Sequence, residues 1–152
     1  MDFCEKICNF TMSNWNDGIS NAYILKQDDR FWYYMLKGYK SKRLGLLSKK
    51  YISNVALCKK SEYKPTMEED YRLISRESFL NRPVDIFLDD KYIWSGILGE
   101  DTEIYDTIIK EFKDNRVVLL WGRQIPLEKI VKIEGEFVWY NYWGDYEWKD
   151  YL

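Results

Sequence analysis

The sequence of 152 residues contains no histidine, and this absence removes several kinds of chemistry at once. Histidine is the commonest general base, the usual partner of a Ser or Cys nucleophile and the commonest zinc ligand. Cysteine is also scarce, because Cys4, Cys8 and Cys58 leave one thiol unpaired under any disulfide scheme. The eight glycines are scattered as turn residues and build no phosphate-binding loop. The sequence therefore predicts a protein that is not an enzyme and has no metal or cofactor.

Long apolar runs are also missing. A membrane-spanning helix needs roughly 20 consecutive apolar residues, and no stretch of this chain comes close. The first residues, from Met1 to Lys6, do not have the basic-then-apolar layout of a secretion signal. Together with the odd number of thiols, which suits a reducing compartment, these features predict a cytoplasmic protein with no membrane partner.

Aromatic residues, by contrast, are abundant. Hydrophobic residues make up 46% of the chain and aromatic residues 18%, with 13 Tyr and 7 Trp. That is enough apolar material for one ordinary domain or two very small ones. Large rings in this number indicate either a densely packed core or an adhesive surface.

Short apolar runs separated by turn signals predict a mainly β protein. In the first half we expect strands at residues 22–25, 31–36, 43–47 and 52–58, and in the second half at 84–88, 92–98, 103–112, 116–121 and 130–133. Residues 103–112 also carry apolar side chains four apart, which would suit a helix, but their Ile, Tyr and Thr content favours a strand. Residues 113–115 and 122–127 are expected to form turns.

A single helix is expected between the two sets of strands. Thr66 followed by Glu69 has the spacing of a capping box, acidic residues crowd the first turn, and Pro83 prevents continuation, so we expect a helix over residues 67–80. The resulting organisation is a lead-in segment (1–20), a β-rich basic subdomain (21–62), a helix plus small barrel (66–134) and an acidic aromatic tail (135–152) that packs on the barrel or is exposed.

Part of the second half is similar to a known family. The run Leu80-Asn81-Arg82-Pro83-Val84-Asp85-Ile86-Phe87-Leu88, the segment Ser95-Gly96-Ile97-Leu98 and the ending Ile125-Pro126-Leu127-Glu128-Lys129-Ile130 resemble the Sm-like domain, a small barrel related in rhythm to SH3-like barrels. The resemblance covers about residues 66–134. It implies a strongly bent five-stranded barrel and, in that family, RNA binding in loops. Asp101 matches the family's loop Asp, but the Asn that should follow is missing, so the implied fold is better supported than the implied function.

A similarity between two segments of the chain makes two barrels conceivable. Residues 43–47 and 116–120 both read as Arg followed by an aliphatic strand and a polar turn. The fold class expected from the sequence is therefore mainly β, with one or two small SH3/Sm-like barrels and a single linking helix.

Charge is unevenly divided along the chain. Residues 1–62 hold 11 basic and 6 acidic side chains, and residues 63–152 hold 12 basic and 19 acidic ones. Residues 37–60 contain eight Lys or Arg and no Asp or Glu. Such a stretch is typical of a lysine-guarded strand edge, or alternatively of a nucleic-acid-binding face. The candidate residues for RNA are Lys37, Lys40, Lys42, Arg43, Lys49 and Lys50.

The C-terminal segment is the most unusual part of the sequence. It has eight aromatic residues among the last 17 and only one Lys. It either completes the core or presents an epitope for a partner with a basic surface, because Trp and Tyr concentrate binding energy and acidic residues steer such a partner. The candidate partner-binding residues are Trp139, Tyr140, Tyr142, Trp143, Asp145, Tyr146, Glu147 and Trp148.

These features favour a small non-enzymatic protein that binds another protein, such as an inhibitor, a toxin immunity protein or a phage-encoded antagonist of a host defence enzyme. The alternative is an Sm-like RNA-binding module. A third reading is a carboxylate and magnesium nuclease that uses Asp89 or Asp101, although the paired carboxylates of the chain fall at expected turns and at the expected helix start.

Overall fold

Antiparallel strands make up most of the described part of the protein. The computed structural model describes residues 4–13, 18–37, 41–58, 73–89 and 103–139. Three short 3-10 helices accompany the strands: η1 (Lys49–Tyr51), η3 (Arg76–Phe79) and η5 (Leu127–Lys129). The ten strands are β1 (Ile7–Met12), β2 (Ile19–Gln27), β3 (Phe31–Lys37), β4 (Ser41–Ser48), β5 (Ile52–Leu57), β6 (Pro83–Leu88), β7 (Glu103–Lys113), β8 (Arg116–Leu119), β9 (Gln124–Pro126) and β10 (Ile130–Trp139).

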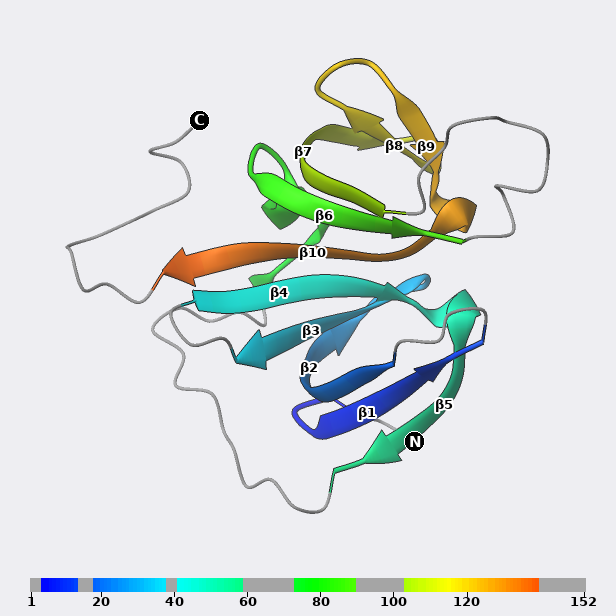
Figure 1. Ribbon diagram of the computed structural model, residues 1–152, viewed down its shortest axis with the longest axis vertical. Helices are drawn as coiled ribbons and strands as arrows, with labels where there is room; N and C mark the ends of the chain where they lie inside the picture. The colour runs from blue at the N-terminus through cyan, green and yellow to red at the C-terminus, as the bar shows by residue number, and fades with distance from the viewer. Residues whose placement is uncertain (1–3, 14–17, 38–40, 59–72, 90–102, 140–152) are drawn as a thin grey trace.

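All ten strands belong to one sheet with the order β5-β1-β2-β3-β4-β10-β6-β7-β8-β9. Figure 1 shows β4 and β10 running side by side through the middle, with the first five strands on one side and β6 to β9 on the other. The last strand of the chain is therefore placed at the centre of the sheet. It joins the N-terminal half to the C-terminal half.

The two halves repeat one pattern of strand pairing. In each half the fifth strand returns to pair with the first, and a 3-10 helix precedes that fifth strand. The register agrees residue by residue, and so do the positions of the bulges. The pairs Cys8↔Leu57, Phe10↔Val55 and Met12↔Ile52 correspond to Val84↔Gly135, Ile86↔Ile133 and Leu88↔Ile130. The pairs Ile24↔Tyr34, Lys26↔Tyr33 and Gln27↔Trp32 correspond to Ile109↔Leu119, Glu111↔Val118 and Phe112↔Val117.

Backbone details of the second strand repeat as well. Asn21 in β2 and Asp106 in β7 both have a positive φ, of 55° and 52°. In both halves the N–H of that residue donates to an Asx side chain of the neighbouring strand, Asn9 at 2.8 Å and Asp85 at 3.0 Å. Asn and Asp tolerate the left-handed region better than other residues with a side chain, so each half uses them at its bulge. The structure thus contains an internal duplication that the sequences of the halves barely show.

The halves share one hydrophobic core. One cluster of buried side chains combines Tyr33 and Leu46 of the first half with Ile86, Val117 and others of the second half. A second cluster, which includes Phe10 and Tyr34, draws almost entirely on the first half. Since Tyr33 and Tyr34 are adjacent on β3 and successive strand residues face opposite ways, the two clusters lie on opposite sides of the central strands.

The predicted mainly β class is confirmed, and most predicted strands are present. Residues 103–112, where a helix was the competing interpretation, form β7. Residues 113–115 contain a tight turn with positive φ at Asp114 and Asn115, as hairpins between twisted strands require. The expected strand at residues 92–98 lies outside the described residues. The similarity between residues 43–47 and 116–120 does not follow the structural repeat. In the repeat, β4 corresponds to β9 and β3 corresponds to β8.

Three expectations need correction. The lead-in segment contains β1, and the expected turn at 122–127 contains β9. The predicted linking helix at 67–80 is not supported: residues 67–72 lie outside the described part, and residues 73–80 hold only the four-residue helix η3. The described residues contain no helix of seven or more. The pairings form an open series from β5 to β9, so barrel closure stays a prediction.

A row of polar side chains locks the two halves together where β4 meets β10. Glu134 is 5% exposed, and its carboxylate accepts hydrogen bonds from the Tyr34 hydroxyl at 2.5 Å and from Lys132 at 3.1 Å. Arg43 donates to Glu134 at 3.3 Å and to Asp85 at 2.8 Å, so its guanidinium bridges β4, β10 and β6. Burial and the neighbouring Glu134 charge raise the pKa of Tyr34 well above its usual value, so the hydroxyl remains a donor.

Gly45 makes this arrangement possible. It lies between Tyr34 of β3 and Glu134 of β10 in the strand register. A Cβ at this position would be 2.3 Å from Cζ of Tyr34, because the phenol ring crosses the β4 backbone to reach Glu134. A larger residue would push the buried ring out of its place and break the link between the halves.

Gly45→Ala is therefore expected to lower the free energy of unfolding by about 3 kcal/mol, through the steric clash and the lost hydrogen bond to a buried carboxylate. Urea unfolding measures this change. The matched control is the same substitution in a Tyr34→Ala background, where the atoms that the new Cβ meets are gone and the added cost is small. Equal costs in the two backgrounds would contradict this account of Gly45.

Candidate binding surface

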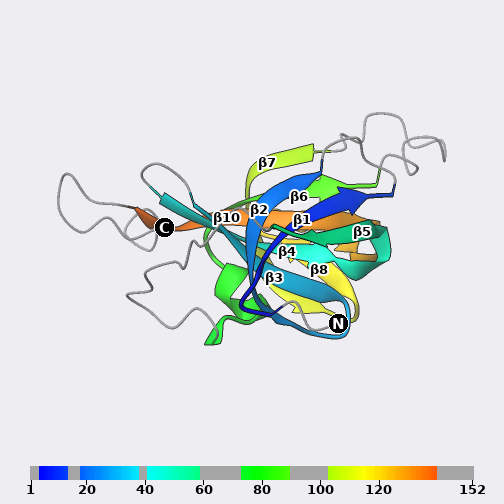
Figure 2. The same ribbon diagram turned by 90° about the horizontal axis from the view of Figure 1, so that it is seen from below.

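The outer face of β2 and β3 in the first half is covered by the segment that precedes β6. Arg76 of η3 stacks its guanidinium 5.1 Å from the ring centroid of Phe31 and donates to Asp28 at 3.1 Å and to Asp29 at 3.2 Å. Figure 2 shows this short green segment beside β3. On either side of Arg76, Ile74 and Phe79 are buried in the same core cluster as Phe31. The cover therefore consists of one charged and two apolar anchors.

Asp28 is the electrostatic centre of this covered face. It accepts hydrogen bonds from Arg76, from the backbone N–H groups of Arg30 and Phe31, and from the Tyr33 hydroxyl at 2.8 Å. Burial by itself would raise the pKa of Asp28, but these hydrogen bonds outweigh it and hold the pKa below its usual value. For Tyr33, burial and the Asp28 carboxylate raise the pKa.

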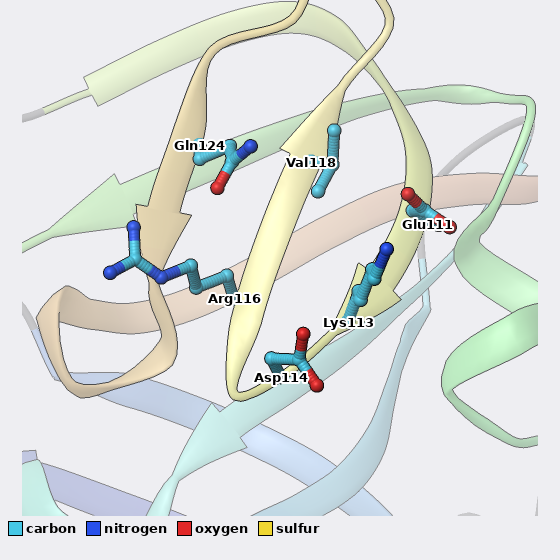
Figure 3. Close-up of a pocket in the computed structure, with 6 residues that line it drawn as sticks. All are labelled: Glu111, Lys113, Asp114, Arg116, Val118 and Gln124. Carbon is cyan, nitrogen blue, oxygen red and sulfur yellow. The ribbon is translucent and has the colours of Figure 1, made fainter.

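The equivalent face of the second half, on β7, β8 and β9, is uncovered by any described residue. It contains a shallow cavity of about 260 Å³. Figure 3 shows the lining side chains spread over the three strands, with a row across the strands and a group around the β7–β8 turn. The lining residues are Glu111, Lys113, Asp114, Arg116, Val118 and Gln124.

Two basic side chains in this cavity have no partner among the described residues. Lys113 and Arg116 are exposed, and within the described ranges they make no side-chain hydrogen bond or ion pair. This differs from Arg43 and Arg76, whose guanidinium groups are paired with carboxylates. Two cations beside Val118 are thus available to a ligand.

Two exposed apolar residues follow β8. Leu120 is 50% exposed and Trp121 is 75% exposed in the turn before β9. By the repeat, Leu120 corresponds to Met35, which is 2% exposed in the first half. Trp121 is three residues along the chain from Val118 and from Gln124, which line the cavity, and Trp and Arg are enriched at the centres of protein-binding surfaces. Reasoning from the sequence missed this surface, because only the turn at 113–115 and the Leu120-Trp121 pair marked it.

Most of the partner-binding residues predicted from the sequence lie outside the described part. Residues 140–152, and with them Tyr140, Tyr142, Trp143, Asp145, Tyr146, Glu147 and Trp148, are not described. Trp139 is the last residue of β10, and its backbone pairs with Ser41 of β4. The tail predicted to begin at residue 135 thus starts as part of a central strand, and the binding role of the remainder stays a prediction.

The basic residues predicted for RNA are divided between the two ends of β4. Lys37 and Lys42 pair across the β3–β4 hairpin, and Lys40 is not described. Lys49 and Lys50 follow the other end of the strand, and Lys49 donates to Gln27 and to the Asp28 carbonyl. Seven residues of strand put Lys42 and Lys49 about 23 Å apart. Arg43 faces three carboxylates, at distances of 2.8 to 3.6 Å, so its charge is neutralised within the protein.

A second cavity, of about 230 Å³, adjoins the seam between the halves. The carboxylates of Asp85, Asp106, Glu134 and Glu136 line it together with Arg43. The side chain of Asp85 is held by Arg43 and by the Asp106 N–H, and Glu136 pairs with Arg43 at 3.6 Å. Burial opposes the charge of Arg43, but Glu134 and Asp85 outweigh it and raise the pKa of the guanidinium. These groups stabilise the seam, and we assign them no ligand.

Of the candidate nuclease carboxylates, the structure describes only Asp89, so this prediction stays untested. Asp89 is 6% exposed at the end of β6, and Asp101 lies outside the described residues. In the part of the chain that the structure describes, no group of three or more Cys, Asp or Glu side chains is placed to hold a metal ion. Within the same residues, no helix is long and apolar enough to cross a membrane.

Comparisons with protein-family models, with curated protein sequences and with solved structures gave no match to this chain. The structure itself is therefore the basis for assigning a function.

The lowered pKa of Asp28 predicts how the cover depends on pH. Because the folded pKa lies below the unfolded value of about 3.9, the stabilisation is present above pH 4 and is lost as the pH falls through the folded pKa. Asp28→Asn is expected to destabilise the protein at pH 6 and to differ less from wild type at pH 3, measured by urea unfolding. Asp29→Asn is the control, because that side chain is 80% exposed. A difference that does not change with pH would contradict the role of the Asp28 charge.

Proposed function

We propose that this chain is a non-enzymatic protein-binding protein that uses the outer face of β7, β8 and β9 together with Leu120 and Trp121. The observation that supports this most directly is the contrast between duplicated faces. The first half buries its face under Arg76 and two apolar anchors. In the second half no described residue covers the same face, Lys113 and Arg116 have no partner among the described residues, and Trp121 is exposed. A partner that covers this face would bury the exposed apolar area of Leu120 and Trp121 and meet the two cations.

The proposal extends to the fold of each half. We infer that each half is a small barrel of the SH3/Sm-like kind. Support comes from the order fifth-first-second-third-fourth in both halves, the 3-10 helix before the fifth strand and the bulge in the second strand. Small barrels of this kind use their loops and open faces for binding, although the fold by itself does not identify a ligand.

The biological class stays at the level of the sequence-based hypothesis. An inhibitor, a toxin immunity protein and a phage-encoded antagonist of a host defence enzyme are all small proteins that act by covering a surface of another protein. The three cysteines, all within the described residues, form no disulfide, which suits the cytoplasm. The acidic aromatic tail would give the chain a second contact with a basic partner.

RNA binding by the basic residues is a weaker proposal. Phosphate contacts need cations that are available on one surface, and the candidate cations are divided between the two ends of β4. Arg43, which the sequence grouped with them, is held by Glu134, Asp85 and Glu136.

Trp121→Ala tests the proposed surface. With the tagged full-length chain as bait in native cell extract treated with nuclease, we expect recovery of a stoichiometric protein partner to fall by about tenfold or more. The melting temperature should stay nearly constant, because Trp121 is 75% exposed. Mass spectrometry of the captured material measures the recovery.

The matched control is Leu57→Ala on β5, at the opposite edge of the sheet, where the side chain is 38% exposed. This change should leave partner recovery as in wild type. Equal recovery with both variants would count against the surface. RNA that is lost on nuclease treatment and at high salt, in place of a protein, would support the RNA-binding alternative.

A further inference from the structure

The cavity on β7, β8 and β9 occupies the place where the first half holds its covering segment. Through the repeat, Lys113 corresponds to Asp28, Arg116 to Phe31, Val118 to Tyr33 and Gln124 to Leu46. Asp28 and Phe31 are two of the residues that Arg76 contacts. The first half therefore shows, within the same chain, how a short segment fits this kind of face.

The central charge of the face differs between the halves. Arg76 meets a carboxylate at position 28 and an aromatic ring at position 31. Both equivalent positions of the second half, Lys113 and Arg116, carry a positive charge, and both are exposed. A segment docked in the equivalent way would therefore need an acidic side chain where the first half has Arg76.

The second half keeps a smaller apolar part on this face. Tyr33 and Met35 of the first half, which share a core cluster with Ile74 and Phe79, correspond to Val118 and Leu120. Leu120 is 50% exposed, so it offers apolar area that nothing described covers. A segment with two apolar side chains at the spacing of Ile74 and Phe79 would bury this area.

We propose that this face binds a short segment of a partner protein with the pattern apolar-x-acidic-x-x-apolar. The spacing is that of Ile74, Arg76 and Phe79, with the charge reversed. The acidic side chain lies between Lys113 and Arg116, and the apolar side chains pack on Val118 and Leu120. Asp114 and Glu111 also line the cavity and disfavour a second carboxylate within it, whereas the position of Glu77, which is exposed in the covering segment, tolerates one. This inference rests on the proposed protein-binding function and specifies the chemistry of the partner.

Local structure of the covering segment suggests the bound conformation. Residues 76–79 form a 3-10 turn in which Ser75 and Ser78 make a reciprocal capping box. The Ser75 N–H donates to Oγ of Ser78 at 3.0 Å. A probe that keeps these two serines keeps the turn that places its three anchors on one side.

The test uses two synthetic peptides and the full-length protein. The probe is the segment of residues 73–80 in which Arg76 is replaced by Glu, and the matched control is the unaltered segment. Each is titrated into isotope-labelled protein, and amide chemical shifts report the site and the affinity. We expect the probe to shift the amides of residues 111–118 and 124 and to bind at least about tenfold more tightly than the control.

Arg116→Glu should reverse the preference, so that the unaltered peptide binds more tightly than the probe. Arg116 is exposed and unpaired within the described residues, so this variant keeps the fold. No shifts on β7 to β9, or equal affinities that Arg116→Glu does not change, would overturn the proposal. If Trp121→Ala still abolishes partner capture in that case, the protein-binding function stands and only the ligand chemistry fails.

A second copy of this chain is the alternative occupant of the face, because the C-terminal segment carries the same residue pattern. Trp143, Asp145 and Trp148 have the same spacing with an acidic centre. Self-association that rises with protein concentration and is removed by Asp145→Lys, measured by sedimentation velocity, would make a second copy the occupant and overturn the assignment to a different partner. A monomer that binds the probe peptide supports the proposal as stated.

Discussion

The buried carboxylate of Glu134 is the group on which the union of the two halves depends. An ionised side chain at 5% exposure is costly unless its hydrogen bonds are satisfied, and Tyr34, Lys132 and Arg43 satisfy them from three strands. The pairing of β4 with β10 puts these residues side by side, and Gly45 leaves room for the phenol ring. Removal of any one partner leaves a charge or a hydroxyl unsatisfied in the centre of the sheet, so the seam also enforces the register of β10.

Duplication explains how one architecture supports two different faces. Both halves keep the same ladders, the same bulges and a positive-φ Asx residue at the same place, because these features set the bend of the strands. The side chains on the outer face are under no such constraint. The face of the first half is apolar and contacts Arg76, whereas the equivalent face of the second half is charged and has no cover among the described residues. Binding by the second copy would then use a geometry that the first copy already shows.

The local patterns of the sequence predicted most strands, since alternation and turn residues act over a few positions. Two strands were not predicted from the sequence. β1 has only short apolar runs and pairs with bulged strands on both sides, and β9 is three residues long beside Gly122 and Pro126. The helix expected at residues 67–80 was favoured by its capping signal, yet Ser75, Ile74 and Phe79 serve tertiary contacts that an extended chain with one 3-10 turn satisfies better. The binding face was missed because its residues come from three strands.

The sequence by itself determined the β class and the positions of most strands and turns, because these depend on composition and on short-range periodicity. Only the tertiary structure decided that the last strand lies at the centre of the sheet, that Arg43 belongs to the seam rather than to a basic surface, and that the halves are copies of one pattern. These properties arise from pairings between residues up to 100 positions apart, such as Tyr34 and Glu134, which leave no local signal in the chain.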